Sequence, residues 1–255
     1  MMILLEAVSV CKTYRNGNQE TPVLKDINLK IHKGEFISVM GPSGSGKSTL
    51  LYAISGLDRV TSGQVLLNGR DLTRLNEDEL ANVRLHNIGF VFQHIHLMRN
   101  LTLLDNIVLS AYLAGRQDRK RIRQRAAELM EMTGIAHLAD HDITQVSGGQ
   151  LQRAAICRAL INSPDILFGD EPTGALNSQS AQDIMRLLDY INRQGMTIML
   201  VTHDPRVAAY TERVLFMLDG RLVAEKRLRK AMHDSPEERR IRENQLSEWL
   251  IRQGF

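Results

Sequence analysis

The sequence predicts an α/β protein with a parallel β-sheet, and three features of its pattern lead to this class. A buried strand, a glycine-rich loop and a helix follow one another over residues 34–54. Apolar runs of strand length at 88–93, 164–171 and 197–204 each end in polar or acidic residues. Candidate helices separate these runs, as parallel strands require. Because ligands bind at the carboxyl ends of parallel strands, we expect the functional residues there.

Length and composition fit one large α/β domain or a domain with an inserted subdomain. The chain has 255 residues, 43% hydrophobic and 24% charged, with a net charge of +3. This excess, from 32 basic and 29 acidic residues, is too small to indicate nucleic-acid binding. Cys11 and Cys157 lack zinc-type spacing and are expected to be reduced, mostly buried thiols. We expect neither a signal peptide nor a membrane span, so another polypeptide would supply any membrane part.

A phosphate-binding loop is the most specific motif. It reads Gly41-Pro42-Ser43-Gly44-Ser45-Gly46-Lys47-Ser48-Thr49. The glycines permit positive φ and close approach of phosphates, and the following helix adds its positive N-terminal end. Lys47 is expected to reach the β- and γ-phosphates of a nucleotide, and the Ser48 hydroxyl to ligate Mg²⁺. The alternative is a chance glycine-serine turn, which the strand-loop-helix setting argues against.

Two acids end the apolar run that begins at Pro164. Asp170 is expected to hold Mg²⁺ through water, and Glu171 to polarise the water that attacks the γ-phosphate. Neighbouring carboxylates at a strand end can also be solvated turn residues. The phosphate loop upstream favours the catalytic interpretation.

Three polar residues are weaker candidates when each is taken alone. Gln93 ends the run 88–93 and could face Mg²⁺ or the attacking water, or be a surface residue at a strand end. His203 follows the run 197–201 and could contact the γ-phosphate, although an isolated histidine is usually a surface residue. Tyr14 could lay its ring against adenine or be a half-buried strand tyrosine.

A second glycine-rich helix start is Ser147-Gly148-Gly149-Gln150. One triphosphate does not need two phosphate cradles from one chain, so this motif predicts a dimer in which each site is completed by the opposite subunit. The alternative is an ordinary N-cap formed by Ser147.

The remaining pattern is mainly helical. Helices are expected at 100–114, 119–133, 150–161 and 178–193. The basic run 116–121 is interpreted as a solvated helix start because acids follow it. In the tail, a capping Ser235, Pro236 and Glu238 predict a helix to about Arg252. We expect it to pack on the chain's own core or its dimer mate rather than on a membrane or another partner.

In their order, these motifs resemble the ATP-binding-cassette (ABC) ATPases over residues 2–226. The resemblance implies a P-loop NTPase with a RecA-like parallel-sheet core and an antiparallel β subdomain. It also implies a helical subdomain inserted at about 94–160, within an ATPase domain of residues 1–226 that a helical tail, 227–255, follows. Tyr14 then corresponds to the adenine-stacking position, Gln93 to the Q-loop and a metal ligand, Glu171 to the general base and His203 to the switch histidine.

The resemblance further implies ATP and Mg²⁺ as ligands, a homodimer, and a separate transmembrane permease that holds the protein at the cytoplasmic face of the inner membrane. No direct nucleic-acid partner is expected. Two positions depart from the family pattern: Val146 replaces a leucine, and Asn177 replaces the aspartate that ends the D-loop. Asn177 removes a charge at the expected dimer seam.

Residues 170–174 and 201–204 resemble the branch of lipoprotein-release and macrolide-export ATPases. The sequence of residues 174–177 is similar to that of bacitracin-type peptide resistance transporters. Transport of an amphiphilic substrate is therefore expected. The alternative is a nucleotide-gated regulatory ABC module that controls cell-wall enzymes through a membrane partner. A motor subunit does not encode the substrate or the direction of transport.

Overall fold

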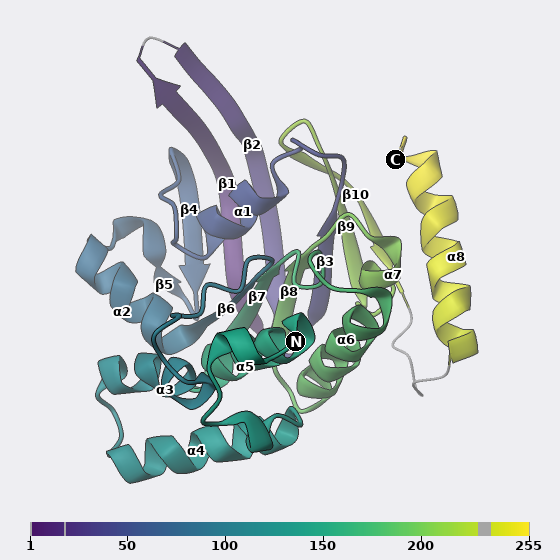
Figure 1. The fold of residues 1–255 in the computed structure, drawn as a ribbon. Coiled ribbons are helices and arrows are strands. Elements are labelled where there is room, and N and C mark those ends of the chain that lie inside the picture. The colour runs from purple at the N-terminus through teal and green to yellow at the C-terminus, as the bar shows by residue number, and fades with distance from the viewer. Residues whose placement is uncertain (1, 18, 229–235, 255) are drawn as a thin grey trace. The chain divides into compact units, whose positions relative to one another are not determined.

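In a computed structural model of the protein, residues 2–17, 19–228 and 236–254 are described. The chain forms two compact units. The first comprises Met1–Asn76 and Asn192–Phe255, and the second comprises Glu77–Ile191. Both contain strands and helices, in agreement with the predicted α/β class (Figure 1).

The first unit contains an antiparallel sheet with the strand order β2-β1-β4-β5. Its strands are β1 (Ile3–Asn16), β2 (Gln19–His32), β4 (Ser62–Leu67) and β5 (Arg70–Asp71). The apolar pattern at 2–10 and 23–31 indicates two strands of that length, but the hairpin continues until Asn16 pairs with Gln19. These extra residues are largely exposed and lack the alternating apolar pattern, so periodicity could not detect them.

The parallel strands of the first unit carry its phosphate loop. β3 (Phe36–Met40) pairs in parallel with β8 (Thr197–Val201) and with β9 (Arg213–Leu218). β10 (Arg221–Arg227) pairs antiparallel with β9. Every residue of β3 and β8 is buried, which explains their uninterrupted apolar sequences. The helix α1 (Lys47–Ile54) follows β3 after the loop.

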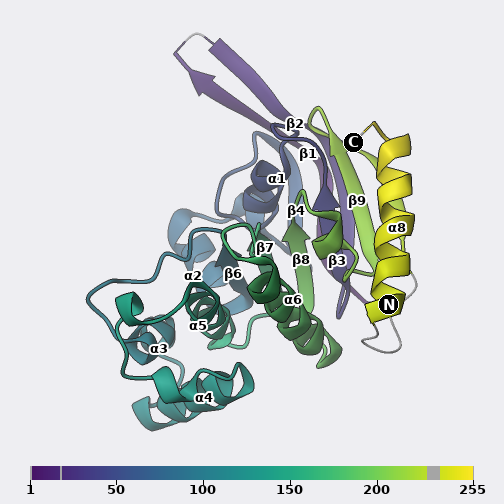
Figure 2. The ribbon, with the colours of Figure 1, turned by 45° about the vertical axis from the view of Figure 1, so that its right-hand side comes forward.

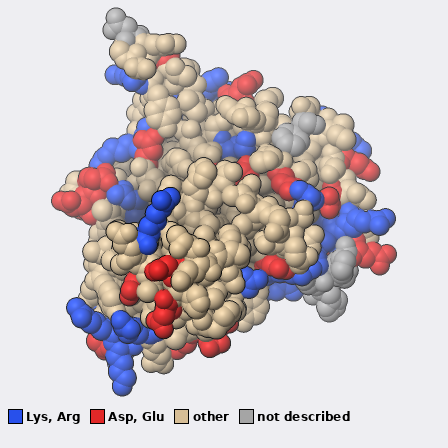
Figure 3. All heavy atoms as spheres, in the orientation of Figure 1, with Lys and Arg blue, Asp and Glu red and all other residues tan. Residues whose placement is uncertain are grey.

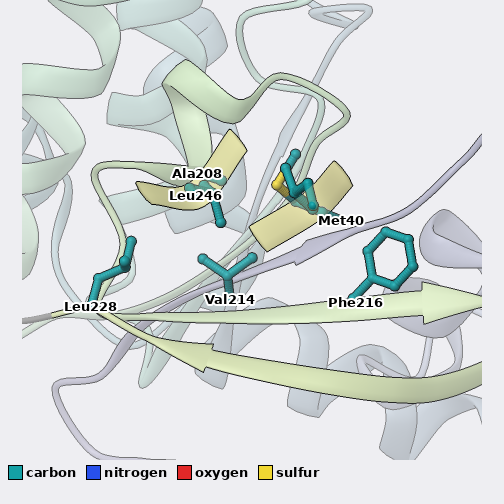
Figure 4. Close-up of a cluster of buried hydrophobic side chains, with 7 residues drawn as sticks. Met40, Ala208, Val214, Phe216, Leu228 and Leu246 are labelled. Atoms are coloured by element: carbon teal, nitrogen blue, oxygen red, sulfur yellow. The ribbon is translucent and has the colours of Figure 1, made fainter. Parts of the chain in front are cut away.

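The C-terminal helix α8 (Pro236–Arg252) packs on the core of the first unit. Figures 1 and 2 show it beside β9, and Figure 4 shows the side chains involved. Leu246 and Leu250 are buried in a cluster with Met40 and Phe216, and Trp249 packs against it. The predicted helix and its packing on the chain's own core are thus confirmed. The expected cap, Ser235, lies outside the described residues.

The second unit combines two parallel strands with helices. It contains α2 (Glu77–Asn87), β6 (Ile88–Phe92), α3 (Leu103–Ala114), α4 (Arg119–Met132), α5 (Gly148–Leu160) and β7 (Ile166–Asp170), and α6 (Ser178–Arg193) begins in it. The helices α3, α4 and α5 pack against one another (Figure 2). Each expected helix is present, with ends displaced by at most three residues at 100–114, 119–133 and 150–161.

The basic run before α4 is a capped helix start, as predicted. The Asp118 carboxylate accepts a hydrogen bond of 2.9 Å from the Arg121 backbone N–H. Lys and Arg side chains gather at the lower left of Figure 3, where Figure 1 draws α4, and acidic side chains lie close to them. Cys157 is a buried free thiol and Cys11 a half-buried one. Within the described ranges, every helix is too short or too polar to cross a bilayer.

Candidate functional site

The phosphate loop is packed so closely that two of its positions require glycine. A Cβ on Gly41 would lie 2.1 Å from the Met217 carbonyl oxygen of β9. Gly46 has φ +101°, and a Cβ there would lie 3.1 Å from the Val23 carbonyl oxygen. By contrast, Gly44 has φ +79° and open space around its Cβ direction. The loop backbone is therefore fixed on one side and open on the other.

The start of α1 is suited to an anion. No side chain caps this helix, and no acidic residue lies in its first turn. The buried Ser45 hydroxyl oxygen has no hydrogen-bond partner among the residues that the structure describes. The Lys47 ammonium donates to the Gly41 and Pro42 carbonyls at 2.8 Å each, so the charge lies against the loop itself. These features fit a nucleotide phosphate, which can accept bonds from the helix start and from Lys47.

Tyr14 lies in β1 within a polar cluster. Its hydroxyl donates to Asp58 at 2.7 Å and shares a side-chain hydrogen bond with Thr49, the last residue of the phosphate loop. The Lys12 ammonium lies 4.7 Å from the ring centroid and 2.6 Å from the Asp58 carboxylate. Burial and the bond to Asp58 raise the pKa of Tyr14. Tyr14 is 43% exposed as a residue, which leaves surface for a flat ligand.

His203 follows β8, beside the strand that leads into the phosphate loop. Val39 pairs with Val201, and the Thr202 N–H donates to the Val39 carbonyl at 3.1 Å. The first unit therefore brings the phosphate loop and the His203 backbone to the same sheet edge. His203 is exposed. Asp204 caps the short helix α7 (Pro205–Ala208). Burial opposes ionisation of Asp204, but its bonds with Arg206 dominate and lower its pKa.

The second unit brings Gln93 and the two acids together at the ends of β6 and β7. Phe92 pairs with Asp170, so Gln93 and Glu171 leave neighbouring strands at the same level. Glu171 has φ +48°, a left-handed conformation that costs a non-glycine residue about 1 kcal/mol. The exposed Gln93 amide lies against the backbone of Gly174, where a Cβ would be 2.9 Å from its nitrogen. Strained and exposed polar residues at strand ends are typical of functional sites.

The signature segment Ser147–Gln150 forms a complete capping box at the start of α5. The Ser147 hydroxyl accepts from the Gln150 N–H at 3.3 Å, and the Gln150 side chain accepts from the Ser147 N–H at 2.8 Å. The structure therefore contains the N-cap that was the alternative interpretation of residues 147–150. It uses the same hydroxyl and amide groups that a phosphate would contact.

The D-loop departure at Asn177 has a local explanation. Its side-chain oxygen accepts from the Ser180 N–H at 2.9 Å, which caps α6. Asparagine and aspartate are equally good in this position, so the substitution keeps the cap while it removes a charge. Leu176 and Ser180 lie beside the signature glycines, 3.5 Å and 3.1 Å from Cβ positions built on Gly148 and Gly149. The D-loop therefore supports the signature loop of the same chain.

Sequence reasoning missed two residues of α5 that hold this region. Gln152, 1% exposed, donates from its amide to the Phe92 and Pro172 carbonyls. Arg158 donates to the carbonyls of residues 95 and 96, and burial lowers its pKa. A signal for Gln152 was available: it is four residues before Ile156 and eight before Leu160, on the buried side of the helix.

Together, the glycine loop between strand and helix and the strand that ends in two acids define a P-loop nucleotide-binding protein. The family model for ABC transporters matches residues 24–174, more than half of the chain. The chain belongs to this family and contains its ATPase domain.

Two groups of known proteins support this assignment. MacB, the macrolide export ATP-binding/permease protein of Pasteurella multocida (strain Pm70), is 43% identical over 222 residues, 87% of this chain and 34% of that protein. MacB of Chlorobaculum tepidum (strain ATCC 49652 / DSM 12025 / NBRC 103806 / TLS) is 43% identical over 224 residues, 88% of this chain and 34% of that protein. The chain thus spans about a third of the length of these curated relatives.

A solved dimeric ATP-binding cassette, in a post-hydrolysis state bound to ADP and Pi, is 42% identical. It aligns with a TM-score of 0.82 and covers 89% of this chain and 100% of that chain. A dimeric cassette of a bacterial ABC transporter matches equally well, with a TM-score of 0.82. These similarities confirm the predicted α/β P-loop NTPase fold.

Proposed function

We propose that the chain is the ATP-hydrolysing subunit of an ABC transporter, which dimerises on Mg-ATP and drives a separate membrane permease. The observation that carries this proposal is the contrast between two helix starts. The start of α1 is uncapped and packed for a phosphate, whereas the start of α5 is exposed and closed only by its own side chains. The first suits the chain's own nucleotide, and the second suits a nucleotide brought by another copy.

Each residue role follows from the local chemistry and the family resemblance. Tyr14 stacks on the adenine, and residues 41–49 enclose the phosphates with Lys47 neutralising the β- and γ-oxygens. Glu171 takes the proton of the attacking water while His203 contacts the γ-phosphate. Residues 147–150 of the second copy donate hydrogen bonds to that same phosphate, which stabilises the charge that develops in the transition state.

Ser48, Gln93 and Asp170 are the proposed Mg²⁺ ligands. Hydroxyl, amide and carboxylate oxygens are the hard donors that Mg²⁺ prefers, and this ion usually takes few protein ligands beside phosphate and water. When bound there, Mg²⁺ would supply positive charge that neutralises the phosphate oxygens. The donor set present in this chain fits that ion.

An amphiphilic substrate, such as a macrolide, an antimicrobial peptide or a lipoprotein, is our proposal for the transported class. The similarity to MacB, whose name joins an ATP-binding part with a permease, supports it. The permease would hold the protein at the cytoplasmic face of the membrane. Co-purification with the product of a neighbouring permease gene tests this part. If the ATPase activity of the purified complex with the permease did not change with any amphiphile tested, this proposal would be contradicted.

The hydrolytic role is tested by Glu171→Gln. We expect turnover to fall at least 100-fold, in the range found when a catalytic group is removed, while ATP still binds and now holds the dimer together. ATP hydrolysis and size-exclusion chromatography with ATP measure the two properties. Glu131→Gln, an exposed carboxylate on α4, is the matched control and should leave both unchanged. Robust hydrolysis by Glu171→Gln would refute the assigned base.

A further inference from the structure

The Gln152 side chain bridges two backbone segments that carry catalytic residues. It projects from α5 and is 1% exposed. Its amide nitrogen donates to the Pro172 carbonyl at 2.8 Å and to the Phe92 carbonyl at 3.2 Å. Because both partners are carbonyl oxygens, only the NH₂ group of the amide can face them, and it uses both of its hydrogens.

These two carbonyls have a particular place in the chain. Phe92 directly precedes Gln93, and Pro172 directly follows Glu171. The pairing of β6 with β7 ends at the pair Phe92 and Asp170, so no backbone ladder fixes the two segments beyond that point. The Gln152 amide forms a cross-link where the ladder stops.

The geometry just beyond the ladder needs such a link. Glu171 is held at φ +48°, and the chain then turns so that the Gly174 N–H donates to the Glu171 carbonyl at 3.0 Å. A strained residue keeps its conformation only where its surroundings determine it. Arg158, two turns along the same helix, donates to the Ile95 and His96 carbonyls at 3.0 Å and 2.7 Å. α5 thus holds the segment after β6 at two points.

We propose that Gln152 is a positioning residue for ATP hydrolysis, which sets the separation of Gln93 and Glu171 through the carbonyls beside them. This rests on the proposed function, because Glu171 must be the base for its position to control turnover. Gln152 does not touch the nucleotide in this scheme. Its loss therefore lowers kcat and leaves the affinity for ATP unchanged, since small displacements of a reacting group are costly in rate.

The test compares three variants of the full chain. Gln152→Met keeps the length of the side chain and removes both donors. Gln152→Glu keeps its shape, but an ionised carboxylate repels the two carbonyls and a protonated one can donate to one of them. Asn162→Leu is the matched control, because Asn162 also donates to two carbonyls, of Leu85 at 2.9 Å and Ser110 at 3.3 Å, away from Gln93 and Glu171.

We expect Gln152→Met to lower kcat about 10-fold or more, the effect of roughly 1.4 kcal/mol on the barrier, with the affinity for a fluorescent ATP analogue changed less than about 2-fold. Gln152→Glu should regain activity relative to the unmodified protein as the pH is lowered. Asn162→Leu should lower Tm with kcat retained. Unchanged kcat in Gln152→Met, or an equal loss in Asn162→Leu, would overturn the inference.

Two measurements separate this inference from the proposed function. An unmodified chain that binds but does not hydrolyse ATP contradicts the proposed function itself. An active chain with an inactive Glu171→Gln and a fully active Gln152→Met contradicts only the role of Gln152. If Gln152→Met does not fold, the pH profile of Gln152→Glu decides, and a profile parallel to that of the unmodified protein counts against the inference.

Discussion

The starts of α1 and α5 are both glycine-rich and both present the positive end of a helix, but only α5 is capped by side chains. Within the described ranges, no side chain caps α1, and the buried Ser45 hydroxyl beside it has no hydrogen-bond partner. The start of α5 is closed by Ser147 and Gln150, which cap each other. A helix start that lacks a cap gains its hydrogen bonds from a ligand, whereas a capped one must exchange bonds it already has. We therefore infer that the start of α1 is kept for the phosphates of the chain's own nucleotide. The start of α5 would bind a phosphate only when a second copy brings one.

The largest expected effect is on the α1 side. Lys47→Ala removes the ammonium that neutralises phosphate oxygens, and we expect ATPase activity to fall roughly 10²- to 10³-fold. In the structure the Lys47 ammonium donates to the Gly41 and Pro42 carbonyls of its own loop, so a thermal melt accompanies the assay to show that the variant stays folded. Steady-state hydrolysis measures the loss of activity. Activity within a few-fold of the unmodified protein would show that this loop is not the phosphate site.

At the start of α5, the variant Ser147→Asp distinguishes two roles of Ser147, the capping of the helix and the proposed binding of a phosphate. Aspartate caps a helix as well as serine does, so stability should be retained. Its negative charge repels the γ-phosphate of the opposing nucleotide, and we expect hydrolysis to fall about 10-fold or more through the lost bond and the repulsion. Binding of ATP to the isolated chain should remain normal. If this variant is fully active, Ser147 only caps the helix and does not bind the opposing phosphate.

The glycines of the two loops should respond unequally to an added methyl group. In Gly41→Ala the new Cβ meets the Met217 carbonyl at 2.1 Å, and we expect a loss of stability of about 1–3 kcal/mol. In Gly148→Ala the nearest atom is 3.5 Å away, an ordinary contact, so stability should change little. Chemical denaturation of both variants tests this. Equal losses would contradict the fixed backbone assigned to the phosphate loop.

The smallest effect concerns Asp58 beside Tyr14. Burial opposes ionisation, but hydrogen bonds from Lys12 and Tyr14 dominate and lower the pKa of Asp58. A lowered folded-state pKa contributes stability that is present above the unfolded-state pKa and is lost as the pH falls through the folded-state pKa. Asp58→Asn should therefore lower unfolding free energy at neutral pH, by less than about 1 kcal/mol for a partly exposed pair, and the difference should vanish in acid. A constant difference across pH would exclude this linkage.

Sequence reasoning predicted what local pattern determines. The buried runs that became β3 and β8, the glycine loop and the start of α6 all follow from residues within one element. The bridge made by Gln152 could not be predicted in this way, since it joins residues that are 60 and 20 positions away in the sequence. The Tyr14 hydroxyl likewise donates a hydrogen bond to Asp58, which lies 44 positions away in the sequence. Motif roles came from the resemblance, whereas the contacts that hold those motifs needed the fold.

The most direct test mixes two impaired chains, Lys47→Ala and Ser147→Asp, and measures ATP hydrolysis. In a mixed dimer, the intact phosphate loop of the Ser147→Asp chain meets the intact signature segment of the Lys47→Ala chain. We therefore expect the rate of hydrolysis to rise on mixing above the average of the two separate variants, each of which keeps its low rate. If mixing restores nothing although the two variants form mixed dimers, then both helix starts serve one nucleotide within a single chain and the account is wrong.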